Sequence, residues 1–198
     1  HNYIVTDIKD LIRTVKEAFY IARTGRPGPV LIDLPSDVIN SSIEFDYPEE
    51  VNLPGYNPRY EPLEEELEEA AELISKAERP LVFAGGGIVL SGAADQLRDF
   101  VRSLRIPVTT SLMGLGSYPV DDELSLGMPG MHGSKYANFA LCETDLIIAA
   151  GVRFDDRVTG KIEAFAPKAQ VIHIDIDPAE INKNVDTVLS ITGDAGIV

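Results

Sequence analysis

Asp145-Leu-Ile-Ile-Ala-Ala-Gly-Val-Arg-Phe-Asp-Asp-Arg157 is the stretch that decides the fold. Residues 146–150 are apolar without alternation, which is typical of a strand covered on both faces in a parallel sheet. Open α/β sheets bind ligands beyond the carboxyl ends of their strands. Gly151 lets a ligand approach the backbone closely, and Arg153 and Arg157 offer planar sets of donors to a carboxylate or phosphate. The stretch therefore predicts a central strand followed by a binding site.

Strand-like and helix-like segments alternate around this stretch. Glutamates crowd the first turns of a predicted helix over 63–76, and Lys76 lies near its end, as suits the helix dipole. Apolar runs predict four more strands, at residues 81–84, 107–111, 171–175 and 188–192. Five strands separated by helices or long crossovers predict an α/β fold: a doubly wound, mainly parallel Rossmann-like sheet of about five or six strands.

The first sixty residues read differently. Apolar residues at helical spacing predict a helix from about Ile8 that stops near Gly25, and residues 29–34 read as a buried strand. One helix and one strand are too little for an independent core. Residues 41–60 are acidic, polar and proline-rich, as in a linker. We expect three parts, residues 1–40, 41–60 and 61–198, of a longer protein, because the chain opens without an initiator Met.

Composition narrows the class of protein. The 198 residues are 44% hydrophobic, enough for a buried core, and carry a formal charge of −15, the wrong sign for nucleic acid or an anionic membrane surface. The single Cys142 cannot form an internal disulfide, and no apolar run approaches the roughly 20 residues that span a bilayer. We expect a globular protein of the cytoplasm that binds no nucleic acid and no membrane.

Several candidate residues have two readings. Gly85-Gly-Gly87 lies between a strand and a helix, where it either cradles a phosphate or only makes a tight turn; Leu90 stands where a dinucleotide fingerprint needs glycine. Asp175 could accept hydrogen bonds from a ribose or cap a helix at Pro178, for which Asp177 is better placed.

The charged residues and methionines also leave alternatives. Arg153, Asp155, Asp156 and Arg157 form either a ligand site or surface ion pairs. The methionines of the glycine-rich loop before Gly133 provide an apolar ligand surface or pack on the core. His132 is a better site candidate than His173, which lies within a strand. The three histidines and one cysteine show no zinc spacing, and no Gly-x-Ser-x-Gly elbow is present.

Motifs along the whole chain resemble one family. They are Gly151 to Gly160, Thr110-Ser-Leu-Met-Gly-Leu-Gly-Ser-Tyr-Pro119, Asp121-Asp-Glu-Leu-Ser125, Gly130-Met-His-Gly133 and His173-Ile-Asp-Ile-Asp-Pro-Ala-Glu180. Together they resemble the catalytic large subunit of acetolactate (acetohydroxyacid) synthase. The resemblance implies that residues 1–40 end a pyrimidine-binding domain for thiamin diphosphate, as a helix and strand remnant, and that residues 61–198 are the central FAD-binding domain.

The family's enzymes decarboxylate pyruvate with thiamin diphosphate and Mg²⁺ and add the two-carbon unit to pyruvate or 2-oxobutyrate, in branched-chain amino acid synthesis. FAD lies across the central domain without net redox chemistry. Two matching positions, Asp156 and Arg157, face the substrate and inhibitor channel. By the resemblance the FAD contacts are Arg59, Gly86, Gly87, Ser111, Leu112, Gly130, Met131, His132, Gly151, Val152, Arg153, Asp155, Asp175, Ile176 and Asp194.

The resemblance also places the catalytic groups and metal ligands of the parent enzyme outside this chain. Gly193-Asp-Ala-Gly196 only echoes the metal motif, so we expect residues 1–198 alone to be inactive and to hold no catalytic residue and no metal. The expected partners are the remaining domains of the enzyme, a second copy in a homodimer or tetramer, and a regulatory subunit. Two alternatives stay open: a spacer domain of a related thiamin enzyme that binds no ligand, and a flavin-containing carboligase for another 2-oxo acid.

Overall fold

The computed structural model describes residues 1–198, which form two compact units, residues 1–58 and 59–198. The first unit contains strands β1 (Asn2–Ile4) and β2 (Leu31–Asp33), 3₁₀ helix η1 (Ile8–Asp10), and helices α1 (Leu11–Arg23) and α2 (Ser36–Ile39). The two strands pair in parallel, and β1 was not predicted from the sequence. Strand β2, which the sequence predicted to be buried, is partly exposed: Leu31 is 63% exposed, because the sheet has only two strands.

The segment expected to be a linker, residues 41–60, contains no helix or strand, yet residues 48–56 contact α1 and the residue after it. Lys16 of α1 donates to the carbonyls of Pro48 and Glu49. The Tyr56 hydroxyl donates to the carbonyl of Thr24 at 2.9 Å. These side-chain bonds to backbone carbonyls attach residues 48–56 to the first unit.

The second unit alternates strands and helices as predicted. Its elements are α3 (Glu64–Lys76), β3 (Pro80–Ala84), α4 (Gly86–Leu90), α5 (Ala94–Leu104), β4 (Val108–Thr110), η2 (Leu112–Gly114), α6 (Lys135–Glu143), β5 (Leu146–Ala150), α7 (Asp156–Thr159), η3 (Ile162–Ala164), β6 (Gln170–Asp175) and β7 (Leu189–Thr192). All five strands are parallel, in the order β4-β3-β5-β6-β7. The predicted α/β class and parallel sheet are confirmed.

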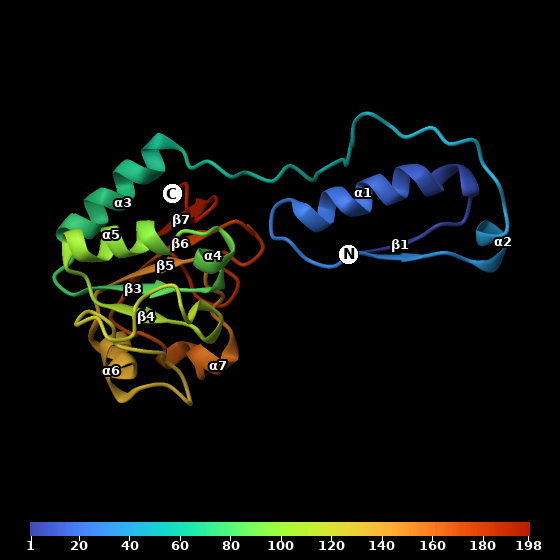
Figure 1. Ribbon diagram of the computed structural model, residues 1–198. Coiled ribbons are helices and arrows are strands. Elements are labelled where there is room, and N and C mark those ends of the chain that lie inside the picture. The colour runs from blue at the N-terminus through green and yellow to red at the C-terminus, as the bar shows by residue number, and fades with distance from the viewer. The chain divides into compact units, whose positions relative to one another are not determined.

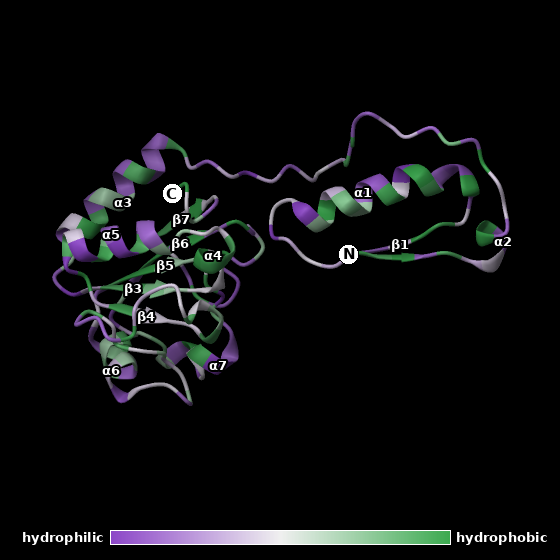
Figure 2. Ribbon diagram, viewed as in Figure 1, coloured by the Kyte–Doolittle hydropathy of each residue, from purple (hydrophilic) through white to green (hydrophobic).

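Helices cover both faces of this sheet. Helices α3 and α5 lie on one face, and α6 and α7 lie on the other (Figure 1). Strand β5 is buried along its whole length, as its unbroken apolar run predicted, with Ile148 in the core under α3 and α5 and Ile147 in the core under α6. The central strands are hydrophobic, and the helices carry hydrophilic residues (Figure 2). The sheet is therefore the middle layer of three.

The outer edge of β4 is covered by an extended segment of the loop expected from the glycine-rich sequence. Val108 N donates to the Leu124 carbonyl, Leu126 N to the Val108 carbonyl and Thr110 N to the Gly127 carbonyl, at 2.9, 2.9 and 3.2 Å. Residues 124–127 thus add a sixth, short parallel segment and satisfy backbone groups that an open edge would expose.

One local alternative from the sequence is wrong. The segment after Asp177 is not a helix but a series of turns. The Asp175 carboxylate accepts from Asp177 N and the Asp177 carboxylate accepts from Ala179 N, at 2.9 and 3.0 Å. Such bonds from Asp side chains to the backbone two residues on compete with helix formation.

No helix of either unit is both long and apolar enough to traverse a bilayer.

Candidate functional site at the carboxyl edge of the sheet

The carboxyl ends of the five strands lie in one row, joined by backbone hydrogen bonds. These bonds run from Ser111 N to Ala84 O, Gly85 N to Ala150 O, Gly151 N to Ile174 O and Gly193 N to Asp175 O, at 2.9, 2.9, 2.8 and 3.0 Å. The chain order reverses between β3 and β5, because β4 lies on one side of β3 and β5 on the other. Such a reversal opens a crevice for ligands at the strand ends. Two site candidates from the sequence, Gly85–Gly87 and Gly151–Arg157, lie at this reversal.

Three glycines allow the backbones after β3 and β5 to touch. A Cβ on Gly85 would lie 2.1 Å from the Gly151 carbonyl oxygen, and a Cβ on Gly87 would lie 2.5 Å from Gly151 Cα. Gly151 itself has a φ of +57°, which favours glycine. Helix α4 has only five residues, and the N–H groups of Gly85 and Gly87 already donate to backbone carbonyls. The segment Gly85–Gly87 therefore mainly allows close packing of the two backbones. Of its three amides, only that of Gly86 has no backbone acceptor.

Arg153 projects from a segment that is held at several points. Val152 and Phe154 on either side of it are buried, whereas the Arg153 side chain is 50% exposed. The Val152 carbonyl accepts from Nε2 of His173 at 2.9 Å, and the Phe154 carbonyl accepts from Nδ2 of Asn184 at 2.6 Å. The Arg153–Asp155 ion pair, at 3.6 Å and half exposed, is worth little. The guanidinium is thus placed by its neighbours and remains accessible to an anion.

Two titratable side chains, those of His173 and Asp175, lie near the carboxyl end of β6 on the same face of the sheet. His173 is fully buried, and this burial lowers the pKa of its imidazole. A carbonyl can only accept, so Nε2 carries the proton that it donates to the Val152 carbonyl, and the lowered pKa favours the neutral ring. Asp175 is 6% exposed, and its Oδ2 lies 3.9 Å from Nε2 of His173. The carboxylate therefore serves the turn at Asp177 and lies at the rim rather than on an open surface.

Apolar side chains line the outer part of this edge. Leu112, Met113 and Met131 are 66%, 75% and 74% exposed, so these two methionines do not pack into the core. Met113 lies beside Gly85–Gly87, because a Cβ on Gly86 would be 3.1 Å from the Cβ of Met113. Exposed apolar side chains next to placed polar groups are typical of a ligand surface.

The loop that carries Met131 lies against α7. A Cβ on Gly130 would lie 2.5 Å from the carbonyl oxygen of Arg157, so the two candidate segments are in contact. The Asn138 side chain of α6 accepts from Gly130 N at 2.9 Å and donates to the Gly130 carbonyl at 3.1 Å. His132 is exposed, Asp156 begins α7, and Arg157 is exposed without an ion pair.

Two of the predicted FAD contacts use their polar groups in bonds within the protein. The Arg59 guanidinium pairs with Glu66 of α3 and donates to the Glu61 carbonyl at 2.9 Å. The Asp194 carboxylate accepts from Gly196 N at 2.8 Å. Arg59 lies beside α3, and Asp194 follows β7 at the end of the row of strand ends. Ser111 and Ile176 directly follow β4 and β6, and the Ser111 hydroxyl accepts from Gly114 N at 3.1 Å.

Sequence reasoning missed Asn138 and Asn184, which hold Gly130 and Phe154 in place. A single amide side chain has no periodicity or spacing that marks it, and only its tertiary contacts show its role. The structure also contains no group of three His, Cys, Asp or Glu side chains placed to hold a metal ion.

One sizeable hollow lies elsewhere. A groove of about 870 Å³ runs between α3 and α5, lined by Leu67 and Ile74 from one helix and Phe100 and Leu104 from the other. Pro80 and Pro107, at the amino-terminal ends of their strands, also line it. The lining of this groove contains none of the candidate site residues.

The comparison with known families decides what kind of domain carries this edge. The profile of the family described as "Thiamine pyrophosphate enzyme, central domain" matches residues 67–198. The chain belongs to this family. The match covers the second unit from the second turn of α3 to the last residue, and a central domain of thiamine pyrophosphate enzymes agrees with the Rossmann-like sheet.

Individual relatives of this central domain carry a more specific name. The chain is 53% identical over 196 residues to "Acetolactate synthase 1, chloroplastic" of Oryza sativa subsp. japonica. It is 49% identical over 195 residues to "Acetolactate synthase large subunit" of Corynebacterium glutamicum, and 50% identical over 198 residues to "Probable acetolactate synthase large subunit" of Methanocaldococcus jannaschii. Each alignment covers 98% of this chain but only 30%, 31% and 34% of the relative. The chain thus spans about a third of the length of these relatives.

Proposed function

We propose that this chain is the central part of an acetolactate synthase and that its second unit binds FAD at the carboxyl edge of the sheet. The single observation that carries the FAD proposal is the reversal of strand order between β3 and β5, where Gly86, Arg153 and exposed Met113 converge. The residues fit a flavin dinucleotide: Arg153 suits a pyrophosphate, and Leu112, Met113 and Met131 offer apolar contacts to a flat ring.

The proposed contacts differ in their availability. Arg153, Gly86, His132 and Met131 offer exposed or half-exposed groups to the cofactor. Asp175 would hold a ribose only at the rim, and Arg59 would have to share its guanidinium with Glu66. We therefore assign Arg153 the largest electrostatic contribution, with Asp155 as a further cofactor contact, and Asp156 and Arg157 facing a substrate channel.

For the intact enzyme we propose condensation of pyruvate with pyruvate or 2-oxobutyrate. Thiamin diphosphate and Mg²⁺ would be held by residues outside 1–198, and the domains would be residues 1–40, 41–60 and 61–198. The proposal rests on relatives about 50% identical that are named acetolactate synthase. A homodimer or tetramer with a regulatory subunit completes the proposal. The cytoplasmic location remains a prediction, and the printed name of the rice relative places that protein in the chloroplast.

Flavin titration tests the binding proposal. Adding FAD to the purified chain should quench flavin fluorescence, and Arg153→Ala should weaken the affinity about tenfold or more, because a charge-assisted hydrogen bond is worth about 1.5–3 kcal/mol. Arg79→Ala is the matched control, since Arg79 is an exposed arginine at the amino edge of the sheet. No quenching by the wild-type chain at any FAD concentration would contradict the proposal and favour a spacer domain.

Product analysis tests the proposed reaction. The intact enzyme should form products from pyruvate alone and from pyruvate with 2-oxobutyrate. Exclusive use of glyoxylate or another 2-oxo acid would instead indicate a related carboligase with a flavin.

A further inference from the structure

Two consecutive carbonyls precede Arg153, and each accepts from another element, α4 for the first and β6 for the second. The Gly151 carbonyl accepts from Gly87 N at 2.9 Å, and the Val152 carbonyl accepts from Nε2 of His173 at 2.9 Å. The first donor is backbone and no substitution removes it cleanly. The second donor is the side chain of His173, which ranked below His132 as a site candidate from the sequence.

His173 also fixes the side-chain packing beneath Arg153. Its ring meets Phe154 edge-on, with centroids 5.1 Å apart and planes inclined by 75°. Phe154 in turn contacts Phe83 of β3 and Phe165. Both residues that flank Arg153 are therefore held by one imidazole, through a hydrogen bond on one side and a ring contact on the other.

From this geometry we propose that His173 is a positioning residue for the cofactor site: its Nε2–H holds the Val152 carbonyl and thereby aims Arg153 outward from the strand ends. The proposal rests on the proposed FAD function, because Arg153 needs a ligand for its position to matter. His173 touches neither substrate nor cofactor. It acts through the backbone of Val152 and the ring of Phe154.

The surroundings of the ring support a neutral donor rather than a charged one. The charged groups near it are Asp175 on the same strand and Glu180 on the following crossover, which favour protonation. Burial opposes protonation and is the larger effect, so the pKa of His173 is lowered. Nδ1 is buried and has no hydrogen-bond partner, so a proton on Nδ1 would be a buried, unpaired donor.

The experiment compares His173→Leu with His173→Gln by FAD titration at neutral pH. Leucine removes the donor and leaves the buried Val152 carbonyl unpaired, so the dissociation constant should rise about tenfold. Glutamine carries an amide N–H near the position of Nε2 and should restore the affinity to within about threefold of wild type. Ile172→Val is the matched control, because it alters the neighbouring buried side chain on the opposite face of β6.

The results separate this proposal from the proposed function. A wild-type chain that binds no FAD refutes the function, whereas wild-type binding with equal affinity in His173→Leu refutes the role of His173. Glutamine as weak as leucine also refutes it, because a general packing defect would not be rescued by a donor. Should His173→Leu fail to fold, ¹⁵N spectra of wild-type histidines decide: a neutral Nε2–H form supports the proposal, and an Nδ1–H or charged form overturns it.

Discussion

The contact between Gly87 and Gly151 is a tight requirement at the scale of single residues. Their backbones bring β3 and β5 together at the reversal of the sheet, and each glycine stands where a Cβ would collide with backbone atoms of the other segment. Backbone cannot move aside as a flexible side chain can. The sequence marked Gly87 as part of a turn or a phosphate loop and Gly151 as a point of ligand approach, and only the fold shows that the two pack on each other.

We expect Gly87→Ala to destabilise the protein by about 1–3 kcal/mol, because the new methyl group overfills a backbone contact. Gly28→Ala is the control, since nothing lies within 4 Å of the Cβ it would add. Urea unfolding followed by circular dichroism measures both, and the control should stay within about 1 kcal/mol of wild type. Equal stability of Gly87→Ala and wild type would contradict the close approach.

The buried His173 predicts a pH dependence of stability. Its pKa is lowered in the folded state, whereas the unfolded chain binds this proton at a pKa of about 6.5. Stability from this group is therefore complete above about pH 6.5 and declines as the pH falls below it, since the unfolded state takes up the proton first. Denaturant unfolding at several pH values should show this slope in wild type and lose it in His173→Gln. Parallel curves for the two proteins would show that the ring is not buried and neutral.

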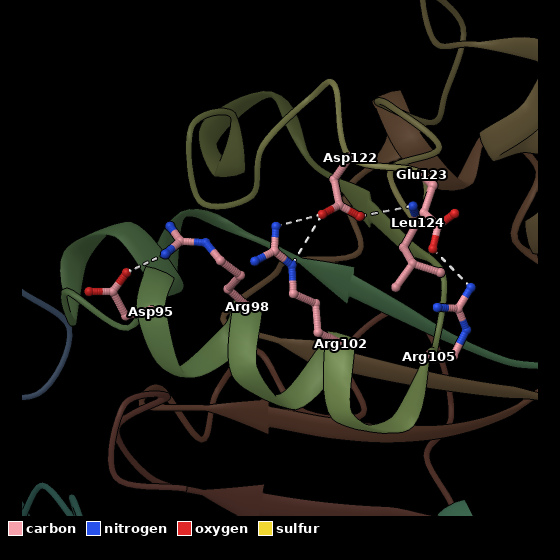
Figure 3. A network of polar contacts seen from close by, with 7 residues as sticks. All are labelled: Asp95, Arg98, Arg102, Arg105, Asp122, Glu123 and Leu124. Carbon is pink, nitrogen blue, oxygen red and sulfur yellow. Dashed lines mark hydrogen bonds and ion pairs between the residues drawn. The ribbon is translucent and has the colours of Figure 1, made fainter.

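At the scale of elements, ion pairs attach α5 to the segment that covers the edge of β4 (Figure 3). Arg102 bonds the Asp122 carboxylate at 2.8 Å, and this carboxylate also accepts from Leu124 N at 3.1 Å. The bond from Arg102, followed by that from the backbone, lowers the pKa of Asp122. Arg105 pairs with Glu123 at 2.9 Å, but both side chains are 71% exposed. Asp122 is thus the better anchor of the two.

We expect Asp122→Ala to loosen residues 124–127 without unfolding the sheet. Amide hydrogen exchange of Leu126 and Thr110 should become faster, because these N–H groups bond Val108 and Gly127 across that edge. Glu123→Ala removes an equal charge from the next residue and should leave both amides protected, since exposed pairs contribute little. Faster exchange in both variants, or in neither, would contradict the assigned anchor.

At the scale of the whole molecule, the two units differ in how much core they can form. The second unit has five paired strands between two helical layers, with apolar clusters on both faces of the sheet. The first unit has two strands, and Ile4 and Leu31 on them are 62% and 63% exposed. A sheet of two strands is marginal on its own.

Separate expression of the units tests this difference. Residues 59–198 should unfold cooperatively on heating, because their core is complete across the sheet. Residues 1–58 should show little fixed tertiary structure and low dispersion of amide resonances. A cooperative transition for residues 1–58 alone would show that two strands and α1 suffice.

The sequence by itself determined the alternation of elements, the parallel sheet and the region of the candidate site. Unbroken apolar runs such as 146–150 report burial on both faces, and residues directly after such runs must lie at one edge of a parallel sheet. The tertiary structure decided what these patterns leave open: the order β4-β3-β5-β6-β7, the mutual packing of Gly87 and Gly151, and the contacts of His173 and Asn184. The reason is physical. Periodicity records whether a residue is buried, but its partner across the sheet depends on strand order and register, which form only when distant segments pack together.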